Sequence, residues 1–275
     1  MRLHATERAS TAADFPATSF ASKLDFDRYL SAHRAILDQI YRHERTFATA
    51  APCSAFPGTC APCFRAANFT GRPDLAAALP DGRCVPDWRE SMVCNCRDRL
   101  NARQRATLHF LLSKTGITVW TRVLALGYAT DLDRRITEHA PRLARCSHLV
   151  REDGAWQLRA ATRSVDVALA SDTLHMMPPL DPALAEIRRV LAPGGQFVFT
   201  VPFRLFAPAT VSRVSELPRS NDDLPAIVGH EVHEIGWDIL DRLRACGFRR
   251  AHGYTYRSEE LGYFGIHNMI FAADV

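Results

Sequence analysis

The chain is poor in lysine and contains no long hydrophobic run. Only two of its 34 cationic residues are lysine, Lys23 and Lys114, and the others are arginine. No apolar stretch approaches the roughly 18 residues that a membrane-spanning helix needs. The N-terminal sequence MRLHATERASTAADF also contains no apolar segment like that of a secretory signal. We therefore expect no membrane association and a cytoplasmic location.

The charge is nearly balanced, and this argues against a general affinity for nucleic acid. The formal net charge is +4, which is too small to imply such a partner by itself. One local cluster of arginines lies beside the cysteines described next, at Arg97, Arg99, Arg103 and Arg105. It has little aromatic interleaving, so nucleic acid is not an expected partner, although an RNA-binding scaffold remains an alternative.

Six of the eight cysteines lie between Cys53 and Cys96. In a chain without a secretion signal, clustered cysteines indicate metal binding more than disulfides. Zinc is held by four thiolates in a tetrahedron, and a CxxC pair with a distant CxC pair can supply them. Reduced thiols in a small core are the main alternative, and Cys53 or Cys84 could replace one ligand. The expected zinc ligands are Cys60, Cys63, Cys94 and Cys96.

Hydrophobic periodicity predicts helices that alternate with strands over the second half of the chain. Such alternation favours a mostly parallel sheet that is covered on both faces. We expect three parts: a flexible N-terminus (1–22), a helical and cysteine-rich module (23–115) and an α/β domain (116–275). The expected helices cover 24–47, 100–113, 130–139, 182–191 and 237–245, and the expected strands cover 119–126, 148–150, 165–170, 197–201 and 268–272, with another from Phe248.

The most specific signal runs from Ser164 to Pro202, which reads as strand, loop, helix, turn and strand. Within it, residues 186–195 have the sequence EIRRVLAPGG. This stretch resembles the second half of a class I S-adenosylmethionine-dependent methyltransferase domain. Residues 88–106, which read WRE…CNC…LNARQRA, resemble an N-terminal cysteine module of some methyltransferase-like bacterial proteins. The resemblance implies a doubly wound, Rossmann-like methyltransferase sheet, and S-adenosylmethionine as cofactor.

The resemblance also implies where the cofactor binds. The family has a glycine-rich loop after its first strand, an acid after the next strand that binds ribose, and a loop after the fourth strand beside the cofactor. Of the glycine pattern only Gly127 is present, and Ala125 replaces the leading acid. Glu152 and Asp153 are the candidate ribose ligands, with exposed loop acids as the alternative. The expected cofactor-binding residues are Gly127, Tyr128, Glu152, Asp153, Asp172 and Thr173.

Three histidines are the candidate catalytic groups, because histidine titrates near neutral pH and can act as a general base. His175 follows the strand at 165–170, and His230 and His233 lie among acids before a helix. The last two could also form a second metal site, although an HExxH motif is absent. Structural roles are the alternative for all three. The aperiodic segment 204–228 is expected to cover the active site as a substrate loop.

Together these features predict methyl transfer from S-adenosylmethionine to a small-molecule acceptor in a protein with a structural zinc. One alternative is an enzyme of the same fold that has lost methyl transfer, such as a cyclase or lyase. The other is a non-catalytic scaffold whose zinc module binds RNA or protein. A homodimer is left open by the sequence.

Overall fold

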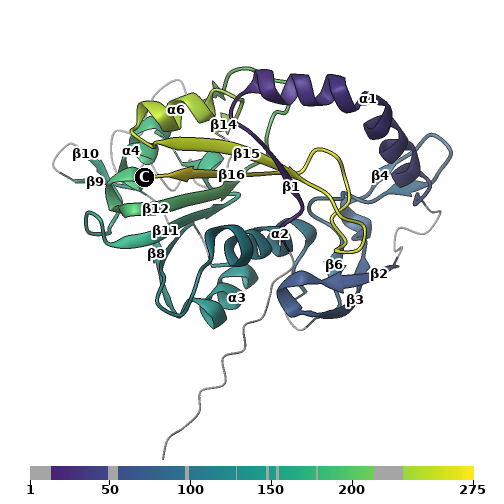
Figure 1. The fold of residues 1–275 in the computed structure, drawn as a ribbon, viewed down its shortest axis with the longest axis horizontal. Helices are drawn as coiled ribbons and strands as arrows, with labels where there is room; N and C mark the ends of the chain where they lie inside the picture. The colour runs from purple at the N-terminus through teal and green to yellow at the C-terminus, as the bar shows by residue number, and fades with distance from the viewer. Residues whose placement is uncertain are drawn as a thin grey trace, which may run out of the picture.

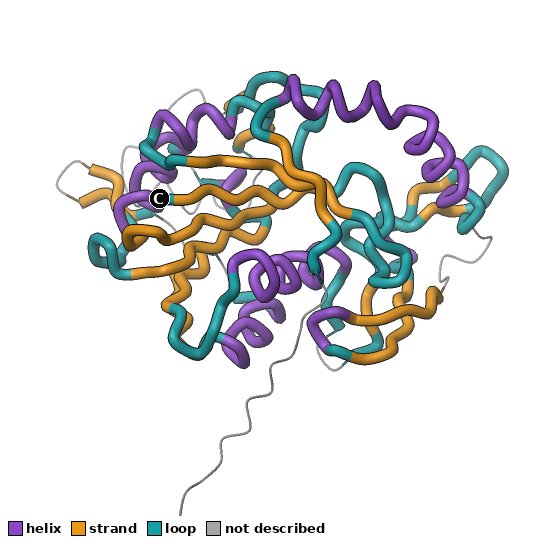
Figure 2. The backbone as a smooth tube through the Cα atoms, in the orientation of Figure 1, coloured by secondary structure: helices purple, strands orange, loops and turns teal. Residues whose placement is uncertain are grey.

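The structure is a computed structural model, and it places a seven-stranded sheet at the centre of the molecule (Figure 1). Helices lie on both sides of this sheet, and a smaller group of strands lies beyond one end of it (Figure 2). None of the helices in the described ranges is long and apolar enough to cross a bilayer. The structure describes residues 14–48, 55–96, 99–127, 129–146, 149–152, 155–177, 179–213 and 232–275.

The central sheet confirms the predicted fold class. Strands β8, β7, β11 and β12 run parallel, β16 is antiparallel to both of its neighbours, and β1 is antiparallel to β15. The chain passes from β7 outward to β8, and then returns to β11 on the other side of β7, as in doubly wound folds. In spatial order the strands are β1 (Ala17–Phe20), β15 (Arg250–Tyr256), β16 (Met269–Asp274), β12 (Leu191–Thr200), β11 (Val165–Ser171), β7 (Arg122–Leu126) and β8 (Arg142–Cys146).

Each face of the sheet has its own core, because successive strand residues point to opposite sides. On β11, Ala168 and Ala170 pack with helices α4 (Leu180–Val190) and α6 (Ile239–Ala245). Val167 and Leu169 pack on the other face, with helices α2 (Ala102–Phe110) and α3 (Asp131–His139). Figure 1 shows these two helix layers above and below the sheet.

Two strands of the sheet differ from the sequence predictions. The sequence predicts a strand at 148–150 after helix 130–139, but β8 takes that place in the sheet. Residues Val150–Glu152 instead form β9, which pairs only with β10 (Ala155–Gln157) in a separate hairpin. The sequence also predicts a loose segment to residue 22, whereas β1 joins the sheet and Phe20 is buried.

Helix α1 (Lys23–Arg45) and the cysteine module complete the fold. The predicted amphipathic helix is present, but Leu24, Ile36 and Tyr41 on it are exposed. The module also contains strands, which the sequence analysis did not predict. It contains a three-stranded sheet and a short hairpin, linked by 3-10 turns. These elements are β2 (Ala55–Cys60), η1 (Ala61–Cys63), β3 (Arg65–Thr70), η2 (Pro73–Leu75), β4 (Ala77–Ala78), β5 (Cys84–Val85) and β6 (Val93–Cys94).

The module packs against the α/β sheet rather than standing apart from it. The amide of Thr59 donates a 2.7 Å hydrogen bond to the carbonyl of Glu260, in the connection between β15 and β16. Helix α2 follows the module in sequence, yet its Leu108 and Phe110 belong to the lower core of the sheet. A π-helical turn, η3 (Leu111–Thr115), then ends at Gly116 in a left-handed conformation with φ 69°. The domain boundary between residues 115 and 116, which separates the cysteine-rich module from the α/β domain in the sequence analysis, stays a prediction.

Candidate functional site

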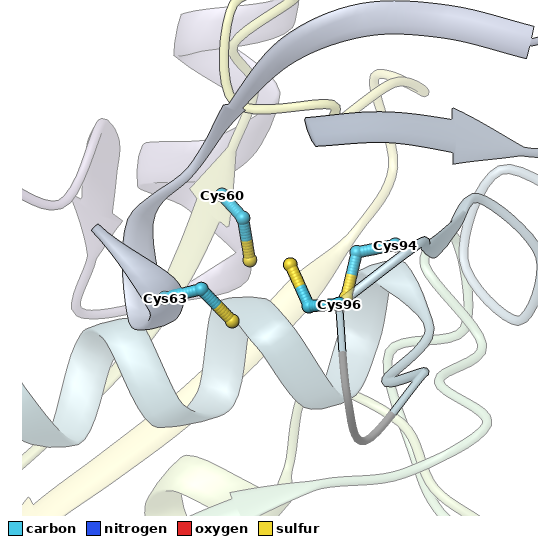
Figure 3. A group of neighbouring side chains, drawn as sticks. All are labelled: Cys60, Cys63, Cys94 and Cys96. Atoms are coloured by element: carbon cyan, nitrogen blue, oxygen red, sulfur yellow. The ribbon is translucent and has the colours of Figure 1, made fainter. Parts of the chain in front are cut away.

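Four cysteines converge at the junction of the module's two turns. Cys60 directly precedes η1 and Cys63 is its last residue, whereas Cys94 lies on β6 and Cys96 just after it (Figure 3). All four Sγ atoms lie within 4.8 Å of one another, and Cys63 is the only one of the four that is not buried. Sequence reasoning chose this set. Cys84 lies apart on β5, and Cys53 lies outside the described residues.

Hydrogen bonds among the thiols shift the pKa values of individual cysteines in opposite directions. Hydrogen bonds with Cys63 and Cys94, together with burial, raise the pKa of Cys60, whereas hydrogen bonds from Cys60 and Cys63 lower the pKa of the Cys94 thiol to about 2. The nearby positive charge of Arg105 partly offsets the rise in the pKa of Cys60, and it contributes to the fall in the pKa of Cys94. A converging tetrad of thiols beside a buried cation fits a four-cysteine zinc site, because four thiolates on Zn²⁺ leave net negative charge.

Arg105 is fully buried and links the cysteine module to the sheet domain. Its guanidinium donates to the carbonyls of Leu261 (2.6 Å), Gly262 (2.9 Å) and Met92 (3.0 Å). The guanidinium carbon also lies 4.1 Å from the centroid of the Phe69 ring, a cation–π contact. These bonds fasten β6, beside the thiols, to the loop before β16.

The second candidate site lies where the order of the sheet reverses, between the carboxyl ends of β7 and β11. Ligands of doubly wound folds bind at this position. Gly127 follows β7 with φ 95°, and a β-carbon built on it would lie 2.5 Å from Oγ1 of Thr173. Thr173 Oγ1 also donates to the carbonyl of Leu126 at 3.2 Å. The end of β11 therefore packs directly on the glycine turn.

Arg89 of the module and Arg103 of helix α2 both contact the end of β11. Arg89 donates to both carboxylate oxygens of Asp172, with 2.7 Å to Oδ2, and to the carbonyl of Val201 at 3.1 Å. Arg103 donates to Oγ of Ser171 at 2.7 Å and lies 3.3 Å from Asp172. Burial opposes ionisation of Asp172, but these two guanidinium groups hold its pKa below the ordinary value. Asp172 has φ 50°, a left-handed conformation that is strained for a residue other than glycine.

Glu90 completes this charged network. It accepts from Nε of Arg103 at 2.7 Å and from Nδ2 of Asn101 at 3.0 Å, and it also contacts Arg89. Asn101 starts helix α2 in a capping box with Gln104, which places Arg103 in the first helical turn. The local sequence LNARQ thus sets the direction from which Arg103 reaches the sheet.

A cavity of about 340 Å³ opens beside this network. Its wall combines the module with the ends of the sheet strands, and it carries charged groups of both signs. It is lined by Asp87, Arg89, Glu90, Val201, Pro202, Phe203, Arg204, His267 and Met269. Mixed charges beside an apolar wall are typical of pockets that orient a small polar ligand.

The structure brings three of the six predicted cofactor residues together: Gly127, Asp172 and Thr173. Glu152 lies on β9, in the hairpin outside the main sheet. Tyr128 and Asp153 lie outside the described residues. The ribose-binding assignment of Glu152 and Asp153 stays a prediction.

Strand β8, which follows β7 along the chain, has the sequence RLARC and carries no acid. Arg145 is paired with Asp133 of α3 at 2.8 Å. The residues directly after Cys146 lie outside the described ranges.

The structure also brings two of the three predicted histidines close together. His175 lies on the turn η4 (Leu174–Met176) and His233 on β14 (His233–Glu234), and both are buried. Burial is the main cause that lowers the pKa of His233, and the nearby His175 lowers it further. Nδ1 of His233 lies 2.8 Å from Oγ of Ser212, on the short strand β13 (Val211–Ser212). His230 and most of the predicted substrate loop lie outside the described residues.

Sequence reasoning did not identify Arg89 and Arg103 as site residues. Arg103 lies in the LNARQRA segment just after the helix cap Asn101, whereas Arg89 lies in the WRE segment, outside any helix or strand. Their target, Asp172, follows Arg89 by 83 residues, and nothing in the local pattern connects them.

The donor set can be compared with the needs of S-adenosylmethionine. The charges of Asp87, Arg89 and Glu90 around one cavity fit the ammonium and carboxylate of its amino-acid end. Gly127 and Thr173 lie at the ends of β7 and β11, where ligands of doubly wound folds bind. The side chain of Thr173 fills the space beside Gly127. The amino-acid end of the cofactor is therefore the part that the described residues fit.

Comparisons with known proteins agree with the fold. A family model described as a methyltransferase domain matches residues 113–199. No curated protein matches the chain.

Several solved structures are similar at low identity. An S-adenosylmethionine-dependent methyltransferase from Mesorhizobium loti is 15% identical, with 58% of this chain and 92% of that chain covered and a TM-score of 0.36. A methyltransferase from Thermotoga maritima, described as a possible histamine N-methyltransferase, is 14% identical, with 61% and 88% covered and a TM-score of 0.37. The 1,6-didemethyltoxoflavin-N1-methyltransferase from Burkholderia thailandensis is 15% identical, with 62% and 77% covered and a TM-score of 0.39. Similarity this weak says nothing of activity or ligands.

The family match covers β7, β8, β11 and nearly all of β12, the four parallel strands on both sides of the point where the sheet order reverses. A cluster of four cysteines precedes this segment. Residues 113–199 thus match a methyltransferase-domain model and lie within a Rossmann-like sheet.

Proposed function

We propose that this protein transfers a methyl group from S-adenosylmethionine to a small-molecule acceptor. The observation that carries the proposal is the family match over both sides of the switch point, where doubly wound folds bind their ligands. The cavity beside Arg89 and Glu90 is lined by the residues that follow β12, the strand next to β11, and is of a size for a small polar ligand. We further propose that Cys60, Cys63, Cys94 and Cys96 hold a structural zinc.

In this proposal the chain's own residues bind and orient the reactants. Bound S-adenosylmethionine would supply an electrophilic methyl group on a sulfonium. Asp87, Arg89 and Glu90 would hold its amino-acid end in the cavity. His233 has a lowered pKa, so it is neutral at pH 7 and can accept a proton from the acceptor. Alignment of the two reactants is the main contribution that methyl transfer requires of a protein.

Calorimetric titration with S-adenosylmethionine and S-adenosylhomocysteine tests the cofactor assignment. We expect saturable binding with a dissociation constant in the range of about 1–100 μM. His233→Gln should keep this affinity and lose transfer of labelled methyl groups to small-molecule acceptors. A protein that binds neither compound at about 1 mM contradicts the proposal.

A second candidate function is supported by a specific contact. Thr173 occupies the space beside Gly127 that a ligand could approach, and Arg89 and Arg103 cover the end of β11. A protein of this fold that no longer transfers methyl groups, such as a cyclase or lyase, would have these features. The titration separates the two candidates, because the second predicts a ligand in the cavity and no affinity for S-adenosylhomocysteine.

A further inference from the structure

We propose that the cysteine module positions the ligand-binding end of the sheet, and that the occupied metal site is needed for this. The positioning residues are Arg89 and Arg103, which act through Asp172. This inference rests on the proposed zinc site and on the switch point as the place where the ligand binds. It gives the module a role in the site beyond its own stability.

The first step is the connection between the thiols and the two arginines. Residues on both sides of the Cys94–Cys96 turn are joined by hydrogen bonds of the main chain. The amide of Cys94 donates to the carbonyl of Leu100 at 3.2 Å, and the amide of Arg103 donates to the carbonyl of Arg89 at 3.0 Å. A metal held by Cys94 and Cys96 would therefore fix the turn between the two paired segments. These segments include Arg89 and Arg103, whose guanidinium groups contact Asp172.

The second step is the set of ion pairs that Arg89 and Arg103 make with Asp172, at the end of β11. The Arg103 side chain is 10% exposed, and those of Arg89 and Asp172 are 22% and 18% exposed. Charge pairs this far from water are screened weakly by solvent. Asp172 also donates its amide to the carbonyl of Thr200 at 3.0 Å. With its left-handed φ of 50°, Asp172 needs such external contacts to keep its conformation.

The third step runs from Asp172 to the glycine turn. Thr173 is the next residue, and its side chain packs on Gly127 and bonds to the carbonyl of Leu126. A displacement of Asp172 would therefore shift the contact that shapes the turn after β7. One continuous set of contacts thus leads from the thiols to both sides of the switch point.

Hydrogen exchange of the full chain without cofactor tests this inference. The variant R89Q/R103Q should keep about one equivalent of zinc. Its amides in residues 171–177 should exchange at least about tenfold faster than those of the unaltered protein. Removal of the metal with a chelator should produce the same increase. Strand β16, at Met269–Asp274, serves as the internal reference for global unfolding.

A matched control removes two exposed arginines from helix α1, in R34Q/R42Q, and should leave exchange at 171–177 unchanged. The proposal is overturned if R89Q/R103Q leaves that exchange unchanged, or if the purified protein holds no metal. If removal of the metal speeds exchange everywhere, β16 included, the whole protein has unfolded. The role of the two arginines is then decided by exchange at 171–177 in zinc-bound R89Q/R103Q. Since no cofactor is present, a protein that fails to bind S-adenosylmethionine can still pass this test.

Discussion

At the scale of single residues, Gly127 and Thr173 show how packing can require a glycine. Gly127 has φ 95°, and Thr173 lies where a β-carbon would project. A glycine after the first strand of a doubly wound fold is commonly linked to a close ligand. Here a protein side chain already accounts for the requirement, so Gly127 by itself is weak evidence for a bound cofactor.

Gly127→Ala should destabilise the protein by about 2–4 kcal/mol, because strained backbone and a steric clash both contribute. Gly194→Ala is the matched control, since Gly194 has φ 78° but its added β-carbon would meet nothing within 4 Å. This control should cost only about 1 kcal/mol. Urea unfolding measures both values, and equal losses would show that Thr173 does not restrict the site.

Asp172→Asn should destabilise the protein by about 2 kcal/mol at pH 7, because it leaves Arg89 and Arg103 with Glu90 as their one remaining carboxylate. The folded pKa of Asp172 is lowered, so the stability from its ionisation is present above the ordinary value of 3.8. That contribution is lost as the pH falls below 3.8 towards the folded pKa. The difference in unfolding free energy between the two proteins should therefore shrink in acid. A difference that stays constant from pH 7 to pH 3 would contradict the assigned pairing.

At the scale of elements, the cysteine module has a small apolar core beside its four thiols. In this core Phe69 and Met92 are buried with three cysteines, Phe264 comes from the connection between β15 and β16, and Phe56 and Trp88 are only partly buried. Small modules with such a limited core usually need a metal or disulfides. A metal at the tetrad would fasten β6 to η1, and Arg105 fastens β6 to the loop before β16.

Serine substitution of Cys60, Cys63, Cys94 or Cys96 should reduce bound zinc from about one equivalent to near zero and lower the melting temperature. Cys84→Ser is the matched control, because Cys84 lies in the same module but outside the tetrad. It should keep both zinc content and melting temperature. Elemental analysis and calorimetry measure the two quantities. Zinc that is retained in the Cys94→Ser variant, or lost in the control, would disprove the ligand set.

At the scale of the whole molecule, helix α2 contributes side chains both to the core of the sheet and to the charged network beside the module. Helix α2 belongs to the lower core of the sheet through Leu108 and Phe110, while its first turn carries Arg103 to the module's charged network. Strand β1 comes from before the module and completes the far edge of the sheet. The two parts are therefore contiguous in space at more than one place.

A chain of residues 116–275 alone should not fold, because it lacks α2, β1 and their buried side chains. Loss of several large core residues costs well over the marginal 5–15 kcal/mol of a typical domain, at about 3–5 kcal/mol for each aromatic. Circular dichroism and proteolysis compare it with residues 14–275, which include both elements. A shorter chain with a cooperative unfolding transition would support the boundary at residue 115/116 instead.

The sequence predicted helices and strands most accurately where the signal is a pattern of neighbouring residues. Segment 164–202 gave β11, α4 and β12 with small shifts at their ends, because apolar spacing and the Pro193-Gly194-Gly195 turn are local signals. The two missed strands, β1 and β8, are the edges of the sheet. Edge strands bury less and carry more polar residues, as RLARC in β8 does, so their alternation is weak.

The sequence by itself determined the α/β class and the set of four cysteines that come together, since helix period, strand runs and CxxC spacing depend on neighbours along the chain. Only the tertiary structure decided that Arg89 and Arg103 meet Asp172, and that Thr173 packs on Gly127. Those contacts join residues far apart in sequence, and they exist because the module is packed against the end of the sheet. Local periodicity carries no information about such pairs, so the charged network at the switch point was visible only in the folded chain.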